Sequence, residues 1–404
     1  MEIVSTHKEN DNNNMSQQKN SKLFLIILLG TMSAFGPFII DLYLPSLPEL
    51  KEYFNTTPAL TQVSLMTAMI GMAVGQLILG PVSDKVGRKK PLVISLIIFT
   101  LTSVALIFAP NIHVLITLRA IQGLSAAGSV VLSRAIATDL YRGRELGTFF
   151  ALLMTVHGIA PVISPMAGSF LLTFTDWHGV FVSLTILGLM LLTAVLFYHE
   201  SLPPEKRFHT PLLQAFAVYP TILRNKAFMG FVAMQSLGFG GLFSYISASP
   251  FIFQSSFNLS LLAFSLCFGA NGLGVMTGAN VGNKLDGRLA VRIGVSLFWI
   301  ATVYLACALN LHWGVYFVEA GFFAMTLSLG FIFPTVSMQA MSAERKNAGT
   351  ASALVGFFPF FVGAICSPLV GIGDIFIATS IVLVISSTLT ALVYFKVKDK
   401  MVFD

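Results

Sequence analysis

The chain has 404 residues, of which 55% are hydrophobic and 10% are charged, and its mean hydropathy is +0.81. Soluble domains usually carry about 25% charged residues, so this composition excludes an ordinary soluble enzyme or binding domain. The formal net charge of +6 does not call for a nucleic-acid partner, because the basic residues follow a membrane-topology pattern described below.

Residues 1–22 are polar and lack hydrophobic periodicity, which predicts a disordered tail. Twelve apolar segments follow, most of them close to the roughly twenty residues that cross a bilayer as an α-helix. Lipid offers the backbone no hydrogen-bond partners, and the strict alternation of barrel strands is absent from the sequence, so we expect helices. The predicted segments are 23–44, 59–80, 91–109, 112–136, 146–171, 179–198, 227–250, 260–282, 291–309, 312–335, 349–370 and 374–395.

Basic residues outside or at the edges of these segments lie in the two tails and in every second connection, whereas the alternate connections hold only Lys51. The positive-inside rule therefore places both termini in the cytoplasm and requires an even number of helices in a plasma (bacterial inner) membrane. The basic set comprises Lys8, Lys19, Lys22, Lys85, Arg88, Lys89, Lys90, Arg142, Arg144, Lys206, Arg207, Arg224, Lys226, Lys284, Arg288, Arg292, Arg345, Lys346, Lys396, Lys398 and Lys400.

The longest internal connection, 199–226, contains Pro203, Pro204 and Pro211 and divides the chain into two sets of six segments. The stretch from Gly80 to Asp84 precedes a basic cluster, and Gly282 to Asp286 precedes Arg288 about 200 residues later. This repeat predicts an all-α integral membrane fold of two pseudo-symmetric six-helix bundles, as in transporters that bind substrate between their halves near the midplane. The predicted parts are a tail (1–22), a first bundle (23–198), a linker (199–226), a second bundle (227–395) and a tail (396–404).

The stretch from Gly80 to Pro91 resembles the loop signature between helices 2 and 3 of the major facilitator superfamily. Its glycines permit a tight turn, and Arg88 needs an anion, which Asp139 at the end of the fourth segment can supply. The resemblance implies a cytoplasmic gate that latches the two halves against the start of the eleventh helix. The alternative is a basic loop that only sets the topology. The residues assigned to the gate are Gly80, Asp84, Gly87, Arg88 and Asp139.

The residues Arg119 to Gly123 resemble the R-x-x-Q-G signature of the same superfamily, with Gln122 as its glutamine. Arg119 lies roughly 10 Å inside the outer end of its segment, at a rise of about 1.5 Å per residue. An arginine at this depth costs several kcal/mol without a partner, which makes it a functional candidate. The alternative is that its long side chain reaches the outer surface.

The fifth segment resembles the motif typical of the exporter branch of the superfamily. Its prolines interrupt helix hydrogen bonds and its small residues allow close packing or bending. Ser164 and Ser169 stand where the family has glycines, which weakens the antiporter inference, and a kinked packing helix is the alternative. The residues that carry the motif are Gly158, Pro161, Pro165 and Gly168.

The string Asp-x-Tyr-Leu-Pro-x-Leu-Pro that begins at Asp41 resembles the bicyclomycin/chloramphenicol resistance (Bcr/CflA) group of drug:proton antiporters. Asp41 lies roughly 5 Å inside the outer end of its segment, close enough to the depth of Arg119 for a direct or water-linked pair. Glu319 lies at nearly the depth of Arg119 in the second half. Our hypothesis is that Asp41 carries the proton, with Glu319 as a second candidate, while Arg119 and Gln122 tune the site. The alternatives are a helix cap for Asp41 and a structural role for Glu319.

These features predict a secondary transporter, not an enzyme, that exports small lipophilic or amphipathic compounds in exchange for protons by alternating access. Aromatic clusters at Phe239, Phe243 and Tyr245 and at 357–361 suit such an apolar pocket. The sequence lacks a GxxxxGK[ST] loop and metal-ligand spacing, so we expect no cofactor or metal and the proton gradient as the energy source. The expected partners are the substrate, protons and the bilayer, with no nucleic acid, and a monomer suffices. An exporter of a specific metabolite such as a siderophore, sugar or polyamine is the alternative, and a membrane-embedded enzyme is less favoured.

Overall fold

The computed structural model describes residues 20–207, 219–344 and 348–401, and all regular elements within these ranges are helical. Eleven helices are long and apolar enough to cross a membrane, and α7 occupies the place of the remaining predicted segment. The predicted all-α membrane fold is therefore confirmed. The long helices are α2 (Lys22–Asp41), α4 (Pro58–Val86), α5 (Lys89–Ile107), α6 (Ile112–Leu140), α7 (Gly143–Leu172), α8 (Trp177–Phe197), α11 (Lys226–Pro250), α12 (Leu261–Gly282), α13 (Gly287–Asn310), α14 (Val315–Ala343), α15 (Ala348–Leu369) and α16 (Ile375–Val397).

Several of these helices begin at a residue whose side chain accepts a hydrogen bond from a backbone N–H of the first turn. Such caps satisfy donors that have no partner inside the helix, so they define where the apolar segments start. The capping residues are Thr57, Asn111, Asp176, Asn225, Ser260, Asp286 and Asp374.

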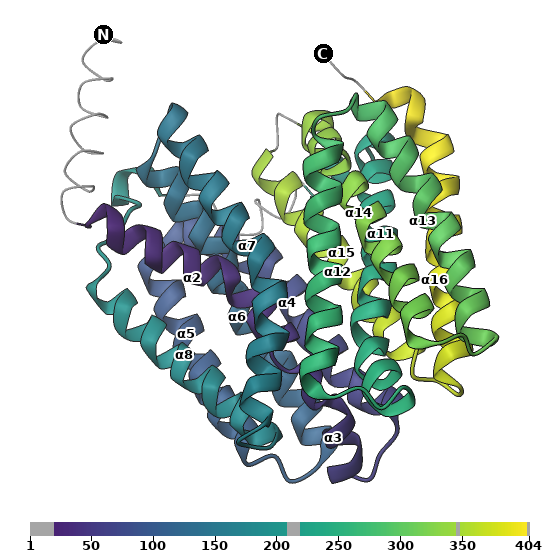
Figure 1. Ribbon diagram of the computed structural model, residues 1–404. Helices are drawn as coiled ribbons and strands as arrows, with labels where there is room; N and C mark the ends of the chain where they lie inside the picture. Colours follow the sequence, from purple (N-terminus) through teal and green to yellow (C-terminus); the bar gives the residue numbers. More distant parts are fainter. Residues whose placement is uncertain (1–19, 208–218, 345–347, 402–404) are drawn as a thin grey trace.

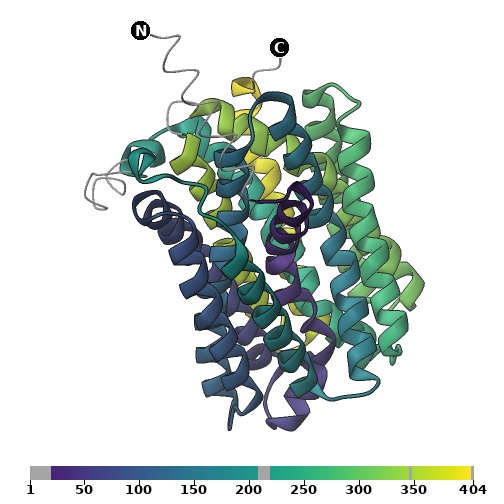
Figure 2. The same ribbon diagram turned by 90° about the vertical axis from the view of Figure 1, so that its left-hand side faces the viewer.

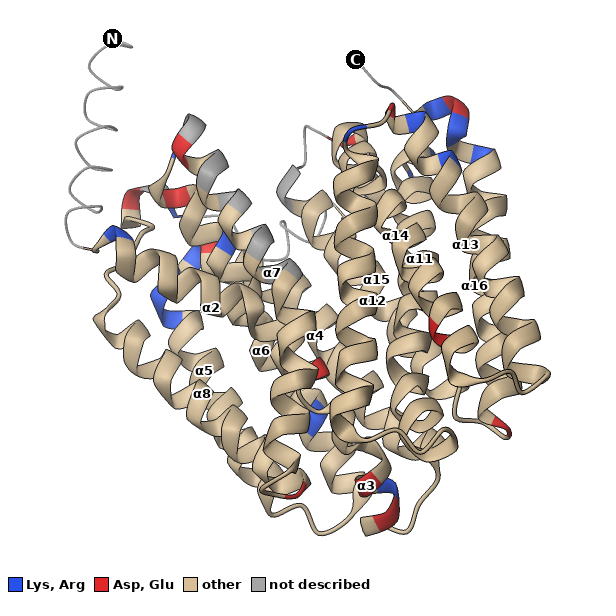
Figure 3. Ribbon diagram, in the orientation of Figure 1, with Lys and Arg blue, Asp and Glu red and all other residues tan. Residues whose placement is uncertain are grey.

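The helices form two groups that lie side by side, α2 to α8 and α11 to α16 (Figures 1 and 2). The short helices η2 (Pro204–Lys206) and α10 (Tyr219–Leu223) lie between them in the chain. Lys and Arg gather at one end of both groups, called the basic end below, and the opposite end is called the far end (Figure 3). The predicted amino-terminal tail, 1–22, lies almost wholly outside the described residues.

Helices α4 and α7 of the first half contact α15 and α12 of the second half, respectively. Hydrogen bonds join the halves near the far end. Gln62 Nε2 donates to the Ser247 carbonyl (3.0 Å), and Gln254 Nε2 donates to the Pro45 carbonyl (3.4 Å). Ser265 Oγ of α12 lies 3.2 Å from the carbonyl of Pro165 in α7. The two halves are thus held together at the far end.

Two helix ends differ from the predicted ones. Helix α4 continues to Val86, so most of the loop signature is helical, and the turn itself is only Gly87, with φ of +99°, and Arg88. After α2 the chain turns through η1 (Leu44–Ser46) into α3 (Leu47–Tyr53), where prolines occupy the first turns and need no N–H partner. Hydropathy does not register either extension, because the added turns are not uniformly apolar.

Candidate functional site

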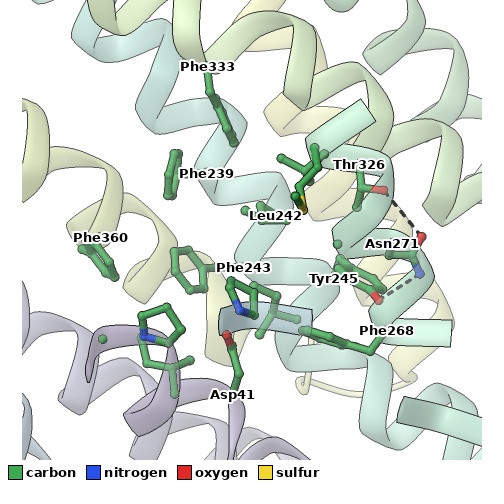
Figure 4. Close-up of a pocket in the computed structure, with 18 residues that line it drawn as sticks. Asp41, Phe239, Leu242, Phe243, Tyr245, Phe268, Asn271, Thr326, Phe333 and Phe360 are labelled. Carbon is green, nitrogen blue, oxygen red and sulfur yellow. Dashed lines mark hydrogen bonds between the residues drawn. The ribbon is translucent and has the colours of Figure 1, made fainter. Parts of the chain in front are cut away.

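A central cavity of about 280 Å³ lies between the two halves (Figure 4). The first half contributes four residues from α2 and Pro161 from α7, while the second half contributes the larger part of the wall from α11, α12, α14 and α15. The cavity therefore lies where a two-bundle transporter is expected to bind its substrate.

Asp41, the last residue of α2, is 5% exposed and lines this cavity (Figure 4). Among the described side chains of the cavity wall it is the only acidic or basic one. Within the described part of the chain, the structure records neither a hydrogen bond nor an ion pair for its carboxylate. The carboxylate therefore faces an otherwise largely apolar space. A buried charge without a hydrogen-bond or ion-pair partner is energetically costly.

Aromatic rings form much of the opposite wall. Phe239 lies 4.4 Å from Phe333 between ring centroids, Phe243 lies 5.7 Å from Phe360, and Tyr245 is stacked on Phe268 at 5.5 Å. The cluster predicted at Phe239, Phe243 and Tyr245 does line the cavity. Of the predicted cluster at 357–361, only Phe360 does so, because neighbouring positions on a helix face different directions.

Arg119 is fully buried in α6, behind the end of α2, and is not part of the cavity wall. Its guanidinium donates to Gln122 Oε1 (2.7 Å) and to the Ile39 carbonyl (3.0 Å), and it lies 4.5 Å from the centroid of the Tyr43 ring. Of the two predicted arrangements with Asp41, the direct pair does not occur between these two described residues, and the water-linked pair remains a prediction. The Arg119 guanidinium reaches the level of the end of α2, but it points to the carbonyl of Ile39, two residues before Asp41, and not to the Asp41 carboxylate.

Gln122 extends this arrangement, because its Nε2 donates to Ser103 Oγ of α5 at 2.8 Å. Tyr43 is bonded in turn to Ser64 of α4 at 2.9 Å. Charge-assisted bonds and a desolvated cation–π contact are each worth roughly 1–3 kcal/mol. Arg119 thus ties the carboxyl end of α2 to three neighbouring helices and positions Asp41.

Glu319 of α14 lies in the second half, next to a polar chain that reaches the cavity. Asn271 Nδ2 lies 2.9 Å from Glu319 Oε1 and 2.9 Å from the Tyr245 hydroxyl. Asn271, Tyr245 and Thr326 line the cavity, whereas Glu319 stands behind them. Its second carboxylate oxygen is buried without a hydrogen-bond partner. The two candidate acids therefore occupy different positions, one in the wall and one behind it.

Three of the predicted gating residues, Asp84, Arg88 and Asp139, form one network at the basic end. Arg88, 6% exposed, donates to Asp139 through Nε (2.8 Å) and Nη2 (3.2 Å) and to Asp84 through Nη1 (2.5 Å). Burial lowers the pKa of Arg88, but the carboxylates of Asp139 and Asp84 outweigh it and the net pKa is raised. The anionic partner predicted for Arg88, Asp139 of α6, is therefore present, and Asp84 of α4 is a second one.

Glu200, just after α8, completes this network. Its carboxylate accepts from the backbone N–H groups of Arg88 (2.9 Å) and Lys89 (3.1 Å) at the start of α5, where the helix dipole favours an anion. A Cβ at Gly87 would lie 2.5 Å from Glu200 Oε2, so glycine is required there for space as well as for its positive φ. These bonds stay within the first half and the start of the linker. The predicted latch partner at the start of the eleventh helix lies largely outside the described residues.

A family model described as the Major Facilitator Superfamily matches residues 23–368. The chain belongs to the major facilitator superfamily.

Three relatives from bacteria agree with this assignment. The uncharacterized MFS-type transporter YdgK of Bacillus subtilis (strain 168) is 38% identical over 87% of this chain and 90% of that protein. A bicyclomycin resistance protein homolog of Haemophilus influenzae is 28% identical, covering 88% of this chain and 90% of that protein. Multidrug resistance protein D of Escherichia coli (strain K12) is 27% identical, covering 85% and 86%. The predicted resemblance to the Bcr/CflA group is confirmed, and the chain is a multi-pass membrane transporter rather than an enzyme.

The fold is also that of solved members of the superfamily. The xylose transporter XylE from E. coli, in a partially occluded inward-open conformation, gives a TM-score of 0.72 with 14% identity, covering 93% of this chain and 97% of that chain. At this identity the likeness concerns the fold alone.

The exporter-type motif of the superfamily lies in α7, and three of its residues have defined surroundings. Pro161 lines the cavity and Pro165 is buried with its carbonyl near Ser265 of α12. A Cβ at Gly168 would lie 2.2 Å from the Leu42 carbonyl, so this glycine lets α7 approach the end of α2. Gly158 lies within α7, and its predicted role remains a prediction.

Sequence reasoning missed Asn271 and Glu200, although an amide inside an apolar segment was a signal for the first. It also passed over Arg134 of α6, whose Nε is buried without a hydrogen-bond partner. Within the described residues, no group of three His, Cys, Asp or Glu side chains could hold a metal ion. The predicted independence from metals and cofactors remains a prediction.

Proposed function

We propose that this transporter exports small lipophilic or amphipathic organic compounds in exchange for protons, and that Asp41 carries the proton. The observation that supports this most directly is the position of Asp41, which alone among the described residues brings an acidic or basic side chain to the wall of the cavity between the halves. Its carboxyl can exchange a proton with water, and a compound in the cavity lies against it. Proton and substrate therefore compete for one site, which couples their movements in opposite directions.

The cavity supports an apolar or amphipathic substrate. Five phenylalanines and Tyr245 line it, and aromatic walls of this kind hold compounds of varied shape through apolar contact and ring stacking. Asn271 and Thr326 add hydrogen-bonding groups at one side. Relatives whose names refer to bicyclomycin or multidrug resistance support the same class of substrate.

The basic end is proposed to face the cytoplasm of a bacterial inner membrane, because positive residues are retained on that side. Hydrogen bonds hold the halves together at the far end, which supports the proposal of a conformation that opens toward the cytoplasm. Opening to the outside would separate those contacts and close the basic end, where the Asp84–Arg88–Asp139 network is proposed to take part in the gate. A monomer suffices, since one chain supplies the whole cavity wall.

Purified protein in liposomes tests this function. With a fluorescent lipophilic compound and no nucleotide present, an imposed proton gradient should drive its movement against the direction of proton flow, and a protonophore should abolish the movement. The compound should also make protons move when it alone is added. Transport that ignores the gradient contradicts the proposal, and a panel in which only one metabolite is moved supports a dedicated metabolite exporter instead.

A further inference from the structure

A groove of about 840 Å³ lies between α13 and α16 at the basic end, separate from the central cavity. Its residues come from the first turns of α13, the last turns of α16 and the short helix η5 (Lys398–Lys400). None of them lines the central cavity, so the groove belongs to a different face of the second half.

The part of the groove nearest the basic end carries an excess of positive charge. Arg288, Arg292 and Lys398 line it together with the single carboxylate of Asp399. The two arginines are four residues apart, so they project from the same face of α13. Arg288 Nη2 donates to the Met401 carbonyl at 3.3 Å, which ties the start of α13 to the end of the chain. Cations from two helices thus converge on one site.

The part of the groove farther from the basic end is apolar and aromatic. Trp299 is 45% exposed and Phe395 is 62% exposed, and Ile300 and Tyr394 lie beside them. The indole Nε1 of Trp299 donates to Thr388 Oγ1 across the groove at 3.3 Å, and Lys398 Nζ lies 5.5 Å from the centroid of the Phe395 ring. Because the chain spans a bilayer, these exposed apolar side chains face lipid, and Tyr394, close to the end of α16, lies where Tyr is typical of the membrane interface.

We propose that this groove binds an anionic phospholipid of the surrounding bilayer, with its phosphate against Arg292, Lys398 and Arg288 and its upper acyl chain against Trp299 and Phe395. Basic pockets between helices at a membrane surface suit such headgroups. A soluble anion would use the cations but not the apolar wall beneath them. The inference requires only that the chain spans a bilayer, so it stands or falls separately from proton-coupled export.

The test is lipid retention by the full-length protein, measured by native mass spectrometry after extraction from nanodiscs that contain phosphatidylglycerol or phosphatidylcholine. Wild-type protein should retain phosphatidylglycerol in preference to phosphatidylcholine. Arg292→Gln/Lys398→Gln should weaken this retention by about 30-fold, since each basic residue near the surface contributes roughly fivefold. Arg224→Gln/Lys226→Gln, which removes two exposed charges from the same end outside the groove, should leave retention unchanged.

A variant with the opposite sign keeps the test decisive if the double variant folds poorly. Asp399→Asn removes the one carboxylate that the described residues bring to the groove and should strengthen retention by about fivefold. Equal retention of the two lipids, equal losses in the two double variants, an unchanged Asp399→Asn protein, or displacement of the lipid by millimolar inorganic phosphate would each overturn the proposal.

Discussion

In the first half of the molecule, buried charges define the site, whereas in the second half aromatic rings do. Arg119 holds the end of α2 and places Asp41 at the cavity, and Arg88 is bonded to two carboxylates at the basic end. The second half contributes most of the cavity wall, and the partly buried acid Glu319 stands behind Asn271. Two bundles of the same architecture thus carry different chemistry. Substitutions in the first half should affect the coupling of transport to protons and the stability of the folded protein. Substitutions in the second half should affect the affinity for the transported compound.

The largest effect is expected from Arg119→Leu. It removes two charge-assisted hydrogen bonds, to Gln122 and the Ile39 carbonyl, each worth roughly 1.5–3 kcal/mol. Transport in liposomes should fall by about 100-fold or more. Arg119→Lys retains the charge but not the planar two-point geometry and should restore only part of the activity. Arg224→Gln, at an exposed position of the basic end, is the control, and a fully active Arg119→Leu protein would remove the positioning role.

Arg88→Ala should lower the melting temperature of the detergent-solubilised protein by several degrees, because it leaves Asp139 and Asp84 without their cation. The raised pKa of Arg88 means that its stabilising effect is fully present below its ordinary, strongly basic pKa and is lost only as the pH rises beyond that range. The difference from wild type should therefore not vary across neutral pH. Lys85→Ala, at an exposed position of the same signature, should change little. Equal melting temperatures for the two variants would contradict the network.

A smaller effect is expected in the aromatic wall. Phe360→Ala removes a ring that lines the cavity and contacts Phe243, and should raise the KM for an apolar compound by about tenfold with little change in kcat. Phe357→Ala removes the same ring from the same helix at a position outside the cavity wall. Equal KM values for the two variants would show that the rings of the cavity do not bind substrate.

The smallest effect is expected from Glu319→Gln. The amide oxygen still accepts from Asn271, so the polar chain to Tyr245 is kept and gradient-driven transport should change by less than about threefold. Asn271→Leu, which breaks that chain, serves as the comparison and should have the larger effect. Complete loss of coupling in Glu319→Gln would move the proton site to the second half.

Helix number and the two halves could be predicted, because apolar length is read directly from the sequence. The direction in which a side chain points around the helix could not. Arg119 and Asp41 lie at similar depths, yet the guanidinium turns to Ile39. Likewise, Phe360 lines the cavity and Phe357 does not. Glu200 could not be found, because its contact with Arg88 joins residues 112 positions apart through packing alone.

Asp41→Asn provides the most direct test of the account, if two kinds of transport are measured on the same liposomes. The variant should still exchange labelled for unlabelled compound across the membrane, since the cavity wall and the helices that form it are kept. It should not respond to an imposed proton gradient, because the amide cannot carry a proton. Transport in the Asn variant that the gradient drives as in wild type would contradict the assignment of the proton to Asp41.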